Sequence, residues 1–488
     1  MPTSSRVVIT PTSRCRFGIG RVDITPPVGI YHRFWGAASH DQATGVHRPL
    51  TATAVILQPL DAEGVSELHV LIAIDHCLFR DDDMQLLRDE TARLIEVDAA
   101  NITFTFSHTH SGGHICRARA DQPGGEMIGP YLDGLPGEIG KAFRSACDSL
   151  RTATLSYGQT TCNMGRHRDF WDETSSQFVC GFNPDLPMEL PLDVVRATAE
   201  NGDALASIVN YSCHPTTLAW DNTLISPDYI GALREVVEQA TDVPCVFLQG
   251  PSGDIGPRDG FVGDTEVADR NGRQVGYAAL SLLESMPAPE ADYRYNGPVI
   301  SGATIGEWEY AAQDSERQRQ TSVFRHRHWD LSLPYRTELQ TVEQGERELN
   351  EFLAQEQAAR ENGDNDRAAD QRALAERSRR LLERLQPLPP GDYPFSLDVW
   401  QMGDAFWVAV EGEPYHALQQ ELNCRFPQTS IIVIELANGS RCSYLPTREA
   451  YGKSLYQVDI ALLTAGCLER ITDELATQIE CWQGERGA

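Results

Sequence analysis

Short apolar runs of strand length alternate with amphipathic segments of helical length between about residue 50 and residue 290. The apolar runs lie at 52–57, 69–74, 102–106, 206–211 and 245–249. Between them, residues 82–97 repeat their apolar positions with a helical period, a second helix ends near residue 150, and a third begins near Pro227. This alternation predicts an α/β fold in which mixed β-sheets are flanked by helices.

The alternation stops at residue 337, where the chain becomes rich in Glu, Gln, Arg and Ala up to residue 385. Apolar residues continue on both sides of a polar breaker at 362–366, and three prolines follow at 387, 389 and 390. This pattern predicts two helices joined by a tight turn, an αα-hairpin inserted at 337–390. There are two alternatives for this hairpin. It is an insertion that packs against the main body or against a twin subunit, or it is a partner-binding arm or lid.

Strand patterns return after the prolines, at 395–402, 405–410 and 431–435, and a long final helix is predicted from about 460 to 479. We therefore expect a single large domain made of 17–336 and 391–488. An N-terminal tail at 1–16 and the inserted hairpin complete the predicted organisation.

The charge balance narrows the function classes. Among 488 residues, 41 Lys+Arg stand against 70 Asp+Glu, a net charge of −29, and the pI is near 4.8. Nucleic-acid binders need a basic surface to displace phosphate counterions, so a nucleic-acid partner is excluded. The same charge argues against electrostatic docking on anionic lipid.

No run of eighteen apolar residues occurs, and the first twenty residues carry charges where a secretion signal needs an apolar core. The twelve cysteines are scattered singly, without a C-x-x-C pair. In a chain of this length such cysteines are typical of reduced, buried small residues. These features predict a cytoplasmic protein with no transmembrane segment.

Histidines follow two of the predicted strands. His108 and His110 come directly after the run 102–106, and residues two apart in extended chain point to the same side. His214 follows the run 206–211, and ligands usually sit at such strand ends in α/β sheets. H-x-H is a recurrent zinc-ligand spacing, although strand-end histidines also occur for structural reasons.

An acidic candidate, Glu413, follows the predicted strand 405–410 in the sequence Glu411-Gly412-Glu413-Pro414. One carboxylate would complete a His-His-Glu set of the kind found in hydrolytic zinc sites, whereas an isolated Glu here would simply cap a helix. Ser252 fails the G-x-S-x-G pattern of serine hydrolases because Asp254 takes the final glycine position. No Walker loop or dinucleotide fingerprint supports a nucleotide cofactor.

Six motifs, in this order, resemble the neutral/alkaline non-lysosomal ceramidases and their bacterial relatives. They are 18–26, 107–113, His214 with 226–229, 250–257, 411–413 and 438–456. The resemblance implies that 17–336 and 391–488 form the catalytic domain. This chain has Gly256 where some relatives carry a serine once considered as a nucleophile, and this departure favours a metal-activated water.

The resemblance also implies residue roles. It assigns one zinc ion to His108, His214, Glu413 and Tyr444. It places three further residues against the substrate or its oxyanion, His110, Arg166 and Tyr456, and leaves open whether Arg166 or Arg168 faces the site. Glu413 would also accept a proton from water, and His110 would protonate the leaving amine.

The function implied is a zinc-dependent amidohydrolase that cleaves the N-acyl bond of a small molecule, with a lipid amide as one candidate and sphingolipid metabolism as its setting. One alternative is a metal-dependent hydrolase of an ester, a lactone or a small polar amide. Another is a non-catalytic scaffold that uses the helical hairpin. The hairpin is also a candidate contact for a homodimer.

Overall fold

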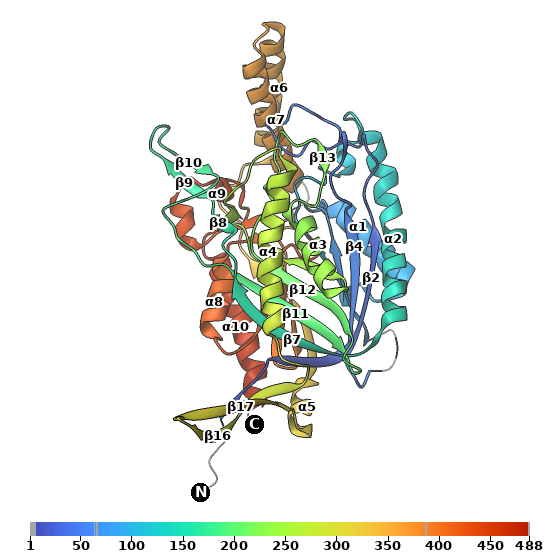
Figure 1. Ribbon diagram of the computed structural model, residues 1–488. Coiled ribbons are helices and arrows are strands. Elements are labelled where there is room, and N and C mark those ends of the chain that lie inside the picture. The colour runs from blue at the N-terminus through green and yellow to red at the C-terminus, as the bar shows by residue number, and fades with distance from the viewer. Residues whose placement is uncertain (1–5, 63, 65–66, 386–387, 487–488) are drawn as a thin grey trace.

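An eight-stranded mixed sheet forms the centre of the computed structural model, which describes residues 6–62, 64, 67–385 and 388–486 (Figure 1). Its strand order is β14-β12-β11-β7-β2-β4-β5-β6. The strands are β14 (Cys245–Gln249), β12 (Ala204–Tyr211), β11 (Pro191–Ala199), β7 (Arg151–Thr161), β2 (Thr12–Asp23), β4 (Thr51–Gln58), β5 (His69–Ile74) and β6 (Ile102–Phe106). Its inner neighbours are antiparallel, whereas the pairs at its two edges, β12–β14 and β5–β6, are parallel.

A second, four-stranded sheet packs face to face on the first. Its order is β18-β19-β20-β22, with bounds Phe324–Leu333, Tyr393–Met402, Ala405–Val410 and Ile431–Ile434. Along β4, Ala54 and Ile56 face the helices while Val55 and Leu57 face the second sheet. This alternation explains why the strands are almost continuously apolar, since both faces are buried.

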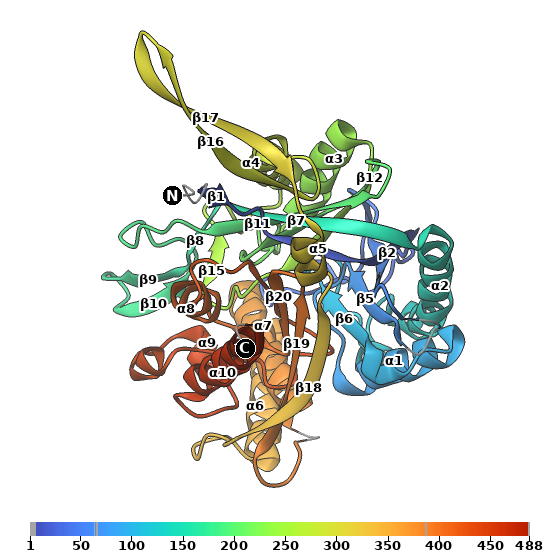
Figure 2. The same ribbon diagram turned by 90° about the horizontal axis from the view of Figure 1, so that it is seen from below.

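Helices close both outer faces, so the molecule has four layers, helix–sheet–sheet–helix (Figure 2). On the large sheet lie α1 (Asp81–Ile95), α2 (Ile128–Ser149), α3 (Tyr229–Thr241) and α4 (Thr265–Ser285). On the small sheet lie α8 (Ala417–Arg425) and α10 (Cys467–Arg486). Gly18 and Gly20 let α2 lie directly on β2, because a Cβ at either position would come within 2.2 Å of a carbonyl oxygen of that helix.

Two hairpins extend from opposite ends of the molecule (Figure 1). One is a β-hairpin, β16 (Ala291–Ser301) with β17 (Ala303–Ala312), which also pairs with β1 (Val7–Val8). The other is helical, α6 (Val342–Glu361) and α7 (Asn365–Leu385). The second helix returns to the body of the same chain, where Ala373 passes so close to Gly36 that a Cβ there would lie 3.0 Å from the alanine Cβ.

The α/β class predicted from the sequence is confirmed, and the strands at 69–74, 102–106, 245–249 and 405–410 agree residue for residue. The sequence reasoning missed β2, β7, β11, β18 and the β16–β17 hairpin. β2 already begins at Thr12, within the predicted tail. Residues 1–5 of that tail, 386–387 of the predicted hairpin, including Pro387, and 487–488 lie outside the described residues.

The predicted start of the final helix near residue 460 is wrong. A short helix, α9 (Tyr456–Ile460), ends there, and α10 starts only at Cys467. Between them Leu463 forms a β-bridge with Tyr335, and Gly466 has a φ of +94°, which a continuous right-handed helix does not allow. Within the described residues, no helix is both long and apolar enough to cross a membrane.

Candidate active site

The carboxyl ends of three parallel strand pairs converge at one place in the molecule. His108 follows β6, His214 follows β12, and Glu413 follows β20 within the two-residue strand β21 (Glu413–Pro414). Tyr444 belongs to β23 (Tyr444–Leu445) and lies directly opposite Glu413 in the β21–β23 pair. Four segments that are far apart in sequence thus deliver one side chain each.

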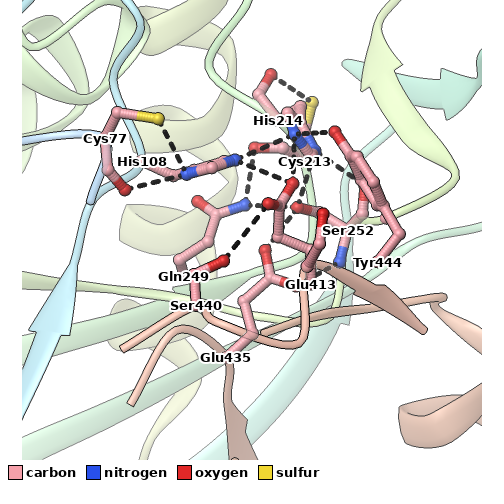
Figure 3. Close-up of polar contacts among 12 residues, drawn as sticks. Cys77, His108, Cys213, His214, Gln249, Ser252, Glu413, Glu435, Ser440 and Tyr444 are labelled. Atoms are coloured by element: carbon pink, nitrogen blue, oxygen red, sulfur yellow. Dashed lines mark hydrogen bonds and ion pairs between the residues drawn. The ribbon is translucent and has the colours of Figure 1, made fainter. Parts of the chain in front are cut away.

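Their polar atoms point at a common centre (Figure 3). The Nε2 atoms of His108 and His214 lie 2.9 Å apart, and Oε2 of Glu413 lies 3.3 Å from the first and 3.4 Å from the second. The hydroxyl oxygen of Tyr444 lies 3.3 Å from Nε2 of His214. All four residues are buried.

The tautomers of the two histidines are set by backbone carbonyls. Nδ1 of His108 lies 2.9 Å from the carbonyl oxygen of Cys77, and Nδ1 of His214 lies 2.8 Å from that of Ser252. A carbonyl oxygen only accepts hydrogen bonds, so each Nδ1 carries a proton, and in the neutral form of each ring the Nε2 lone pair points toward the other ring. Two lone pairs and a carboxylate at these distances require a cation between them, and imidazole nitrogen with carboxylate oxygen is the donor set that zinc prefers. The residues therefore fit a metal ion.

The pKa values of the two histidines and of Glu413 also indicate that the cluster favours a positive charge at its centre. Burial lowers the pKa of His108, but the effects of Cys77 and Glu413 are larger and hold this pKa well above its ordinary value. Burial, together with the charges of Arg168 and His108, lowers the pKa of His214 to about 3. Burial raises the pKa of Glu413, but the two imidazoles outweigh it and keep it well below its usual range. The Glu413 carboxylate thus favours a positive charge beside it, which a proton on His108 supplies when no metal is bound and which a bound metal ion would supply in its place.

A second layer of hydrogen bonds supports His214, the histidine that follows β12. The hydroxyl of Ser252 donates to Oε1 of Glu435 at 2.6 Å and accepts from Nε2 of Gln249 at 2.9 Å, and its backbone N–H donates to Oε2 of Glu435 at 3.0 Å. Ser252 is fully buried, so it orients His214 and is not placed as a nucleophile. Glu435 was missed by sequence reasoning, although an acidic residue that follows the apolar strand β22 was a usable signal.

His110 enters the site from the same loop as His108. Its ring lies 4.5 Å from the Phe34 ring and 5.2 Å from the Trp35 ring, centroid to centroid, and 5.0 Å from the His108 ring. Within the described part of the chain, neither of its ring nitrogens has a hydrogen-bond partner, and both are buried. Tyr456 lies further out, about half exposed, with its ring 6.0 Å from that of Tyr444.

Arg168, and not Arg166, lines the cavity above the cluster. Arg166 lies within β8 (Gly165–His167), pairs there with Gly256, and its guanidinium donates back to the carbonyl of Gly165. Of the two arginines that the sequence left open, the one that reaches the cavity is Arg168, which follows the end of that strand. Arg168 is buried, donates to the carbonyl of Gly253, and lies over the Tyr444 ring at 5.3 Å from its centroid.

A cavity of about 530 Å³ opens above the cluster, within the usual range for small-molecule sites. One side is aromatic, formed by Phe34, Trp35, Trp220 and Phe261. Another part of the wall is formed by α7 of the helical hairpin, where Arg380 lies over the Phe34 ring, and the sequence offered an arm or lid only as one alternative for this hairpin. A usable signal was the spacing of Arg377, Arg380 and Arg384, which puts all three on one face of a helix.

The fold and the cluster together define an α/β protein with a candidate metal site at its strand ends. The chain belongs to the neutral/alkaline non-lysosomal ceramidase family, whose N-terminal sequence model matches residues 15–258. The neutral ceramidase of Pseudomonas aeruginosa is 22% identical over 254 residues, which are 50% of this chain and 37% of that enzyme.

Solved structures support the fold. A ceramidase complexed with C2 superposes with a TM-score of 0.63 at 17% identity, over 98% of this chain and 76% of that one. The crystal structure of neutral ceramidase from Pseudomonas aeruginosa gives a TM-score of 0.60 at 16% identity, over 96% and 74% of the two chains.

Proposed function

We propose that this protein is a zinc-dependent amidohydrolase that cleaves the N-acyl bond of a small amphiphilic molecule, with lipid amides as the leading class. The observation that carries the proposal is the convergence of two imidazole nitrogens, a carboxylate and a phenol at the base of a half-aromatic cavity. Membership of the ceramidase family and the similar names of its relatives support amide cleavage.

His108, His214, Glu413 and Tyr444 would hold the ion. Bound zinc would supply a Lewis acid and lower the pKa of water from 15.7 to about 7. The protein's own contribution is orientation, because Cys77 and Ser252 fix both imidazole rings through their carbonyl oxygens.

Other residues move protons and charge. Glu413 points Oε2 at the imidazoles and keeps Oε1 near the hydroxyl of Ser440, at 3.4 Å, so Oε1 can accept a proton from water. His110 has unpartnered ring nitrogens that can relay a proton to the departing amine nitrogen, which an amide requires. Arg168 and Tyr456 would stabilise the developing oxyanion.

The test combines metal analysis with a substrate panel. The purified chain is expected to contain about one zinc ion and to hydrolyse N-acyl amides at rates that depend on acyl length. His214→Ala should lose both the metal and the activity, whereas His328→Ala, at a histidine on β18 away from the cavity, should keep both. Absence of metal and hydrolysis, with no gain on adding zinc, would overturn the proposal and favour the scaffold alternative. Cleavage of esters or lactones but no amides would favour the other hydrolase.

A further inference from the structure

The α7 side of the cavity carries more positive than negative charge. Arg119, from a short helix of the body, forms ion pairs with Glu376 at 3.0 Å and Glu383 at 2.9 Å. Arg80 pairs with the same Glu383 at 3.1 Å, and Arg380 pairs with the same Glu376 at 2.9 Å. Two carboxylates are thus shared by three guanidinium groups before the last arginine of the helix is considered.

That last arginine, Arg384, lines the cavity and has no counter-ion among the described residues. Among the residues that the structure describes, no carboxylate lies within 4.0 Å of its guanidinium, and its Nη1 atom is buried without a hydrogen-bond partner. Burial, followed by the charge of Arg80, lowers the pKa of Arg384 to about 10, so the side chain remains charged at neutral pH. A guanidinium with a buried, unpartnered nitrogen is costly, and a bound anion would supply the missing partner.

The same cavity also has an apolar part. The aromatic residues Phe34, Trp35, Trp220 and Phe261 line the same cavity as the arginines of α7, and Arg380 lies over the Phe34 ring at 4.8 Å from its centroid. An occupant must therefore carry an apolar part for the aromatic side and an anionic part for the α7 side. Its hydrolysable bond must lie between these two parts, over the imidazole–carboxylate cluster.

We propose that the substrate is an N-acyl amino acid, whose free carboxylate is bound by Arg384 with Arg80 and Arg380 beside it. A planar guanidinium binds a carboxylate through two parallel hydrogen bonds, which gives orientation as well as affinity. In the reaction, the oxygen of water forms a bond to the acyl carbon, the C–N bond breaks, and both protons of the water pass to the nitrogen, which leaves as an ammonium group. The products are a fatty carboxylate and a free amino acid. This proposal rests on the proposed function, since it names the substrate class of the same site.

The test compares two substrates that differ only in charge, N-lauroylglycine and N-lauroylglycinamide, with the zinc-supplemented full chain. Wild-type protein should prefer the carboxylate form. Arg384→Gln should reduce kcat/KM for N-lauroylglycine by about 10- to 100-fold, the worth of a hydrogen bond to a charged group, and leave the value for the glycinamide unchanged. Arg367→Gln, at an exposed arginine on the same helix, is the matched control and should change neither.

Calorimetric titration of metal-free protein with N-lauroylglycine separates this proposal from the parent one. Weaker binding of N-lauroylglycine to Arg384→Gln than to wild type and to the control supports the carboxylate site, whether or not the substrates are hydrolysed. Absence of hydrolysis of both substrates would refute the amidohydrolase proposal and leave the carboxylate site standing. Equal binding of N-lauroylglycine by all three proteins, or equal turnover of both substrates by wild type and Arg384→Gln, overturns the carboxylate site.

Discussion

Glu376 provides the sharpest test of how the helical hairpin is held on the active-site cavity. Its Oε1 accepts hydrogen bonds from Nη2 of Arg119 at 3.0 Å and from Nε of Arg380 at 2.9 Å, and its Oε2 accepts from Nη1 of Arg119 at 3.0 Å. The side chains of Arg119 and Glu376 are only 3% and 8% exposed, so solvent screens this pair weakly. Glu376→Gln removes the charge and keeps the shape.

Removing one member of a buried ion pair costs about 3–5 kcal/mol. We expect the lower end, about 3 kcal/mol, because Arg119 keeps its second carboxylate, Glu383. At 1.36 kcal/mol per factor of ten, this loss corresponds to about a 100-fold larger population of the undocked hairpin. Because α6 and α7 extend from the body and pack on each other, the opening should stay local.

Hydrogen exchange measures that opening directly. In Glu376→Gln the amides of α7 should exchange about 100-fold faster, while those of β12 in the central sheet keep their protection. Glu351→Gln, at an exposed residue of α6, should leave both unchanged. Activity toward N-acyl amides should fall along with α7 protection, since this helix forms one side of the cavity. Unchanged α7 exchange in Glu376→Gln would refute the reasoning that this carboxylate docks the hairpin.

Three further predictions concern the metal cluster and the fold. Tyr444→Phe should weaken zinc binding by about 10- to 100-fold in a chelator competition, and unchanged affinity would remove the phenol from the ligand set. Gly253→Ala should lose zinc while still unfolding cooperatively, because the new Cβ would lie 2.6 Å from the carbonyl oxygen of Glu413; Gly452→Ala, with open space around it, is the control. Asp75→Asn should lower the free energy of unfolding by about 3–5 kcal/mol at pH 7, because it leaves the buried arginine partner on α3 unpaired. Burial raises the pKa of Asp75, but that arginine outweighs it and holds the pKa below its ordinary value. The difference in the free energy of unfolding between wild type and Asp75→Asn is therefore fully present above the unfolded-state pKa near 3.9, and it should shrink as the pH falls through the lower folded-state pKa. A difference that stays constant in urea titrations at acid pH would contradict this account.

Much of the sheet structure was predictable because its strands are buried on both faces. Strands such as β14 and β20 are continuous apolar runs, and their ends are marked by polar or glycine-rich residues. Strands with mixed composition, such as β7 with its alternating Thr, Ser and Gln, carry no comparable signal. The long exposed hairpin of β16 and β17 was missed for the same reason.

The site was partly predictable for a different reason. The strand pattern marked His108 and His214 as strand-end side chains, where ligands usually sit in α/β sheets. Their strands, β6 and β12, lie near opposite edges of the large sheet, so only the folded chain brings the two imidazoles together. The choice between Arg166 and Arg168 could not be made in this way. It depends on where β8 ends against β15 (Ile255–Pro257), a pairing between segments about ninety residues apart.

The amino-acid sequence by itself determined the α/β class, the strand-end histidines and the presence of a helical hairpin, because each is written in local periodicity and spacing. Only the tertiary structure decided that α7 lines the cavity and that Arg384 has no ion-pair partner there among the described residues. The physical reason is that docking depends on ion pairs such as Arg119–Glu376, whose partners are 257 residues apart. Local patterns show that a helix has a charged face, and only the folded chain shows what that face meets.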